Sequence, residues 1–83
     1  MAKQSESTEV LRIDTRGLRP PEPMVRILSL LDRLGPRWSG RIEARLDRRP
    51  LFLFPELEER ELQYTCEPSN DGGYLVTIRR SSP

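Results

Sequence analysis

The spacing of apolar residues changes repeatedly along this chain, and this change constrains the fold more than any single motif does. Apolar residues from Met24 to Leu34 recur at helical spacing, with polar residues on the opposite face. Four other segments alternate apolar and polar residues, which is the period of a strand with one buried face: residues 10–14, 41–46, 62–67 and 74–80. The sequence therefore predicts a strand, a helix and a strand, followed later by a strand hairpin.

A second helix is predicted around Pro55, and the sequence allows two starts for it. Proline has no backbone N–H, so it fits the first turn of a helix and disfavours the interior. The helix could begin near Leu51 with one hydrogen bond missing, or at Pro55 as its first residue. Either way, we expect the apolar segment 51–54 and Trp38 to pack in the core, because so small a domain needs its aromatic area inside.

The predicted order is β-α-β-α-β-β, and each helix and strand has a single apolar face. An α/β (α+β) fold satisfies all of these patterns: a two-layer sandwich in which a four-stranded mixed sheet carries two helices on one face. With 83 residues the chain has room for one domain, which we place at residues 10–80. Residues 1–9 are expected to form a disordered tail and residues 81–83 a short second tail.

The composition excludes several chemistries. The chain has no His, which removes imidazole bases, Ser-His-Asp arrangements and His-dependent metal sites. Its one cysteine, Cys66, cannot form an intramolecular disulfide, and no apolar run is long enough to span a membrane. We expect a cytoplasmic protein that is not an enzyme, with no catalytic residue, no cofactor, no metal site and no membrane partner.

Charge is unevenly distributed along the chain. Residues 12–49 contain ten Arg and five acidic residues, whereas residues 50–83 contain three Arg and six acidic residues. A basic sheet face could meet RNA if aromatic stacking platforms accompanied the charge, but the outward strand positions carry no aromatic residue. Nucleic acid is therefore disfavoured as a partner, and RNA binding is kept as a second alternative.

One motif carries a family resemblance. The pattern L-x-I-D-x-x-G-L-x-P-P-x-P runs from Leu11 to Pro23 and leads into the first helix. With the β-α-β-α-β-β order, it resembles the TusA/SirA-like superfamily of sulfur carriers, over roughly residues 10–80. The resemblance implies that a Cys-Pro-x-Pro motif opens the first helix and that its Cys carries persulfide sulfur. Here Pro20 stands at the Cys position, so the chain looks like a Cys-less branch, a bacterial domain of unknown function. That branch is also expected to close its second helix with a Gly, where this chain has Glu61.

The resemblance and the residues together suggest a non-enzymatic binding or accessory module. Its partner would be an unidentified protein or a small anionic ligand, and the chain would be a monomer or weak dimer. The predicted binding residues surround the first helix entry and the end of the second strand: Arg16, Arg19, Pro20, Pro21, Glu22, Pro23, Arg48 and Arg49. A simpler interpretation is that the prolines only fix the helix entry. The main alternative is a sulfur-transfer or redox protein acting through Cys66, which we otherwise expect to face the core.

Overall fold

The computed structural model describes residues 9–80, and its elements follow the predicted order. They are β1 (Val10–Asp14), α1 (Glu22–Leu34), β2 (Arg41–Leu46), α2 (Leu53–Glu59), β3 (Leu62–Pro68) and β4 (Tyr74–Arg80). The predicted tails at 1–8 and 81–83 lie outside the described residues. Glu9, the last residue of the predicted first tail, accepts a backbone hydrogen bond from Arg41 (3.0 Å) and so continues the line of β1.

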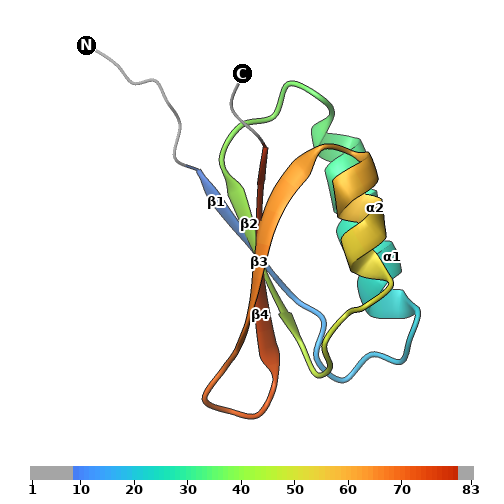
Figure 1. The fold of residues 1–83 in the computed structure, drawn as a ribbon, viewed down its shortest axis with the longest axis vertical. Coiled ribbons are helices and arrows are strands. Elements are labelled where there is room, and N and C mark those ends of the chain that lie inside the picture. Colours follow the sequence, from blue (N-terminus) through green and yellow to red (C-terminus); the bar gives the residue numbers. More distant parts are fainter. Residues whose placement is uncertain (1–8, 81–83) are drawn as a thin grey trace.

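The four strands form one mixed sheet in the order β1-β2-β4-β3. β1 and β2 are parallel, while β4 is antiparallel to both of its neighbours. Both helices lie on the same side of this sheet, as Figure 1 shows. The predicted two-layer sandwich with a four-stranded mixed sheet is therefore confirmed.

The strand register determines which loops meet. Val10 pairs with Arg41, and Arg41 pairs with Arg79, so the described chain begins and ends at one end of the sheet. Leu46 pairs with Tyr74 at the other end. The loops that follow β1 and β2 both leave the sheet from this second end, because parallel neighbours present their carboxyl ends at the same edge. Each of these loops leads into a helix (Figure 1).

The core lies between the sheet and the helices. Alternation along β2 places Ile42, Ala44 and Leu46 under the helices, as predicted. An aromatic pair closes the α2 side, where the rings of Phe54 and Tyr64 stack with centroids 4.9 Å apart. The buried apolar residues come from both layers: Ile27, Leu31, Trp38, Ile42, Ala44, Leu46, Leu53, Leu57, Leu62, Val76 and Ile78.

The second helix begins at neither of the two predicted starts. Its first residue is Leu53, and Phe52 is the N-cap. Pro55 is therefore the third helical residue, inside the first turn, where backbone N–H groups have no intrahelical partner. The missing N–H of Pro55 costs no hydrogen bond there. The Leu53 N–H instead donates to the Pro50 carbonyl (3.0 Å), which fixes the preceding turn.

The end of α2 explains why a glycine was expected at position 61. Glu61 has a φ of 60°, and among the described residues it is the one non-glycine with a positive φ. Its N–H donates to the Glu58 carbonyl (2.9 Å), as residues just beyond a helix end often do. Residues with a Cβ pay about 1–2 kcal/mol in this conformation, whereas glycine does not. Glu61 thus adopts a backbone conformation that glycine favours.

Replacing Glu61 with glycine should relieve this strain. Because Glu61→Gly also removes a side chain, the matched control is Glu61→Ala, which loses the side chain and keeps the strained backbone. We expect Glu61→Gly to have a free energy of unfolding about 1 kcal/mol higher than Glu61→Ala, after allowing for the greater unfolded-chain entropy of glycine. Urea unfolding followed by circular dichroism measures the difference. Equal stability of the two variants would show that the backbone at Glu61 is not strained.

Candidate functional site

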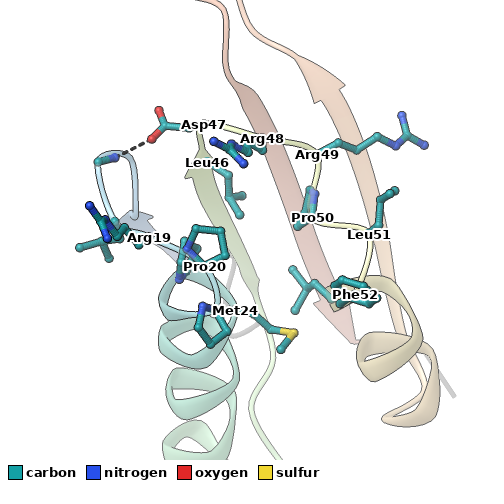
Figure 2. Close-up of a pocket in the computed structure, with 15 residues that line it drawn as sticks. Arg19, Pro20, Met24, Leu46, Asp47, Arg48, Arg49, Pro50, Leu51 and Phe52 are labelled. Atoms are coloured by element: carbon teal, nitrogen blue, oxygen red, sulfur yellow. Dashed lines mark hydrogen bonds between the residues drawn. The ribbon is translucent and has the colours of Figure 1, made fainter.

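An apolar concave feature of the described chain lies between the two loops that leave β1 and β2. It is an open pocket of about 450 Å³, within the range of about 300–1,000 Å³ that is typical of binding pockets. One wall is the entry to α1, and the other is the segment from β2 into α2 (Figure 2). The lining residues are Gly17, Leu18, Arg19, Pro20, Pro21, Pro23, Met24, Leu46, Asp47, Arg48, Arg49, Pro50, Leu51, Phe52 and Leu53.

The inner surface of the pocket is apolar. Met24 extends from α1 toward the wall that carries Phe52 (Figure 2). Leu46 and Leu53 are buried core residues that also line the pocket, so its floor is continuous with the hydrophobic core. A floor of this kind favours an apolar group.

Two large apolar side chains on the rim are open to water, which corrects our expectation that segment 51–54 packs in the core. Leu51 is 62% exposed and Phe52 is 83% exposed, while their neighbour Leu53 is fully buried. Leu51 and Phe52 lie in the turn before α2, so the periodicity of the helix does not direct them toward the core. No sequence pattern identified their exposure.

Three arginines lie on the rim: Arg19 on the α1 side, and Arg48 and Arg49 on the other. No ion pair joins any of them to a carboxylate within residues 9–80. Arg49 points away from the pocket in Figure 2, and its guanidinium carbon lies 5.7 Å from the centre of the Phe54 ring. Arg19 and Arg48 are therefore the two cations best placed to meet a bound anion.

Hydrogen bonds between the two loops hold the pocket walls together. The Asp47 carboxylate accepts a hydrogen bond from the Gly17 N–H (2.6 Å), drawn as a dashed line in Figure 2. Thr15 is buried at the start of the loop after β1. Its hydroxyl donates to the carbonyl of Arg45 in β2 (2.8 Å). The Thr15 N–H donates to the same carbonyl (2.9 Å). No sequence pattern had indicated these roles for Thr15 and Asp47.

The entry to α1 is built from prolines, as the motif indicated. Pro21 is the N-cap and Pro23 follows in the first turn, and no side chain caps this end. The Pro20–Pro21 peptide bond is cis. The Glu22 N–H donates to the Arg19 carbonyl (2.8 Å), so this donor is not offered to a ligand. The helix end thus contributes shape to the pocket rather than a row of free N–H groups.

Six of the eight predicted binding residues line this pocket, and Arg16 and Glu22 do not. The Arg16 guanidinium donates to both oxygens of Asp14 (2.9 and 2.7 Å) and to the Asp71 carboxylate, which joins the loop after β1 to the β3–β4 turn. Glu22 lies 4.0 Å from Arg26 on the next turn of α1. The geometry gives Arg16 a structural role, and ligand binding by the eight residues stays a prediction.

The ion pair between Arg16 and Asp14 should make the free energy of unfolding depend on pH in the acidic range. Hydrogen bonds from the Arg16 side chain and backbone lower the pKa of Asp14 from 3.8 to about 2. A depressed carboxyl pKa stabilises the fold fully above the unfolded value and loses that effect as the pH falls toward the folded value. We therefore expect the free energy of unfolding to decline from about pH 4 to about pH 2, and Asp14→Asn to flatten this decline. Chemical unfolding at several pH values measures it, and an unchanged slope in the variant would contradict the assignment.

Cys66 is not one of the residues that line the pocket. It is partly buried on the helix-facing side of β3 and packs against the core, close to the predicted position. Burial raises the pKa of its thiol most, Glu67 raises it further, and Arg49 works in the opposite direction. The raised pKa reduces the thiolate fraction, and the thiolate is the reactive form of a cysteine.

Residues 9–80 contain no group of three or more His, Cys, Asp or Glu that could hold a metal ion. No helix in this part of the chain is long and apolar enough to cross a membrane. The uncovered sheet face holds Arg12, Glu43 and Arg41 in a chain of ion pairs, each 3.1 Å long. These partly neutralised charges do not favour a nucleic acid, whose absence as a partner stays a prediction.

Comparisons with known proteins establish the fold and the family. The chain has no match among curated proteins. It is similar to the crystal structure of a SirA-like protein from Desulfitobacterium hafniense, with a TM-score of 0.74 and 23% sequence identity, over 89% of this chain and 100% of that chain. This similarity shows that the fold is SirA-like, as the resemblance implied. The model of DUF2249, described as an uncharacterized conserved protein, matches residues 12–80. The chain therefore belongs to the DUF2249 family.

Proposed function

We propose that this chain is a non-enzymatic accessory module that binds an anionic partner in the pocket between the loops after β1 and β2. The observation that carries the proposal is the composition of the pocket lining. It contains no Ser, Thr, Cys, Tyr, Lys or Glu, and the chain has no His. Its one carboxylate, Asp47, already accepts a hydrogen bond from Gly17. Apart from Asp47, side chains that serve as nucleophiles or general bases are therefore missing from the lining.

The lining instead suits binding. Apolar residues form the floor, and Arg19 and Arg48 stand on opposite walls without a carboxylate partner in the described chain. A planar guanidinium binds a carboxylate or phosphate through two parallel N–H donors, a bidentate geometry that the ammonium of a Lys does not offer. The preferred ligand is thus an anion joined to an apolar group.

A difference from the sulfur carriers also supports a non-enzymatic role. In those proteins the residue at the position of Pro20 is the Cys that carries sulfur. Pro20 lines the pocket here, and its ring offers neither a thiol nor an N–H. The pocket keeps the shape of the helix entry without the reactive group.

Sulfur transfer through Cys66 is the alternative. It requires a thiolate, and the burial of Cys66 raises its pKa. The test is mass spectrometry after incubation with a cysteine desulfurase and cysteine. We expect no adduct on Cys66, and a one-sulfur adduct that passes on to an acceptor would overturn the proposal.

Further parts of the proposal rest on the sequence. A cytoplasmic location is consistent with a single cysteine that lacks an intramolecular partner. A bacterial origin follows from the resemblance, and a monomer or weak dimer is the expected state.

Affinity for small amphiphilic anions tests the binding proposal directly. We suggest 4-phenylbutyrate with two matched probes: 4-phenylbutylamine, which reverses the charge, and butyrate, which lacks the ring. We expect 4-phenylbutyrate to bind about threefold to tenfold more tightly than the amine, since an exposed ion pair contributes up to about 1 kcal/mol. It should also bind more tightly than butyrate, because the ring buries apolar surface against the pocket floor. Ligand-observed NMR measures the affinities.

Two charge reversals provide the control. Arg48→Glu should remove the preference for 4-phenylbutyrate over the amine. Arg37→Glu should not, because Arg37 is also exposed but lies in the turn before β2, at the other end of the sheet. Equal binding of the acid and the amine to the unmodified protein would contradict the proposal.

A further inference from the structure

The pocket offers almost no polar group that could recognise a small metabolite. Such sites usually place several buried donors and acceptors toward the ligand. Within residues 9–80, the one buried side-chain nitrogen or oxygen without a partner is the indole nitrogen of Trp38, which is not part of the pocket lining. The charged groups of the pocket lie on its rim, so its floor selects only for an apolar shape.

The apolar surface extends beyond the pocket onto its rim. Leu51 and Phe52 line the rim, and Phe52 is 83% exposed. Exposed aromatic side chains beside a pocket are typical of protein interfaces, where they often supply much of the binding energy. A longer ligand that fills the pocket and also covers Phe52 would bury this exposed apolar surface.

From these observations we propose that the occupant is an acidic peptide segment of a partner protein. The segment inserts one large apolar side chain between Met24 and Phe52, and its flanking carboxylates contact Arg19 and Arg48. This inference rests on the function proposed above, and it names the class of partner.

Charge complementarity specifies that the segment is acidic. Arg19 and Arg48 belong to different walls, so carboxylates on both sides of the inserted residue could reach one arginine each. Charged groups at a rim contribute mainly to partner selection and association rate, while the apolar anchor contributes most of the affinity.

The pocket is also preorganised for such a ligand. Pro20, Pro21, Pro23 and Pro50 restrict the backbone of both walls. The hydrogen bond between Asp47 and Gly17 joins the walls directly. Binding therefore requires little further ordering of the protein, which favours affinity for a flexible peptide.

The pocket and the two ends of the described chain lie at opposite ends of the sheet. β1 begins and β4 ends at the opposite end of the sheet, as the pairing of Val10 with Arg41 and of Arg41 with Arg79 shows. Figure 1 shows the loops after β1 and β2 together at the other end. A concave site of this kind receives a projecting side chain, whereas a flat membrane surface presents none.

The test uses three fluorescein-labelled octapeptides and fluorescence anisotropy. The first is Glu-Asp-Glu-Phe-Leu-Glu-Asp-Glu; the second replaces its acids with Lys, and the third replaces Phe-Leu with Ser-Gly. We expect saturable binding of the first peptide only. Phe52→Ala should weaken it about tenfold or more, as is typical of an interface anchor, and Arg48→Glu should weaken it at least threefold. Arg37→Glu should leave it unchanged. Because Phe52 is exposed, its removal should not disturb the fold.

Four outcomes would overturn the inference. They are equal binding of the Lys peptide, equal binding of the Ser-Gly peptide, insensitivity to Phe52→Ala, and failure of all three peptides. The last outcome, combined with selective binding of 4-phenylbutyrate, would leave the proposed function intact. Two further measurements identify other occupants and would also overturn it. These are Phe52-dependent binding to phosphatidylglycerol vesicles, and Phe52-dependent self-association in sedimentation.

Discussion

Replacing Leu53 with alanine is expected to lower the free energy of unfolding by about 3 kcal/mol. The Leu53 side chain is fully buried where α2 begins, and it lies in the core beneath the pocket. Truncating a buried leucine costs about 2–5 kcal/mol, because apolar contacts are lost and a cavity remains. A single core in a domain this small rarely supplies more than about 3–5 kcal/mol, so we expect much of the variant to be unfolded at room temperature.

The adjacent residue provides the control. Phe52→Ala removes a larger side chain, yet we expect it to cost less than about 0.5 kcal/mol, since Phe52 is mostly in water. Urea unfolding followed by circular dichroism and by Trp38 fluorescence measures both variants. Similar losses at the two positions would mean that Phe52 packs in the core, and the interface proposed for it would fail.

The second large effect is expected at Gly40, just before β2. Gly40 has a φ of 120°, and a Cβ added there would lie 2.5 Å from the Glu9 carbonyl oxygen. The same oxygen accepts the Arg41 N–H (3.0 Å), so displacing it also disturbs the first link between β1 and β2. We expect Gly40→Ala to cost about 3 kcal/mol or more, as strain and overpacking add together.

Gly72 separates the two contributions. Its φ is 94°, but nothing lies within 4 Å of an added Cβ. Gly72→Ala should therefore cost only the backbone strain, about 1–2 kcal/mol. Thermal unfolding of the two alanine variants compares them. If Gly40→Ala lowers the melting temperature no more than Gly72→Ala does, the Glu9 carbonyl does not lie as close to Gly40 as described.

The strands could be predicted from the sequence because their signal is local. Alternation along β2 identifies which side chains are buried before any partner strand is known, and the structure confirms it. The start of α2 was harder, because proline is tolerated at each of the first helical positions. Choosing among them depends on the Leu53 hydrogen bond to Pro50, a contact within the turn that composition does not specify.

The candidate site was predictable in its location and less so in its details. The proline motif and the arginines after β2 both line the pocket, because parallel strands bring the loops that follow them together. Sequence could not separate Arg16 from Arg19. Arg16 bonds Asp14, two positions before it, and Asp71, which lies 55 positions away and meets Arg16 only through the tertiary fold.

The central claim is that the pocket between the loops after β1 and β2 is where this protein binds its partner. Backbone amide NMR during a titration with 4-phenylbutyrate tests it residue by residue. We predict saturable shifts confined to residues 17–24 and 46–53, with no change along the uncovered sheet face or around Cys66. Shifts centred on Arg41 and Arg79, or on Cys66, would contradict the claim.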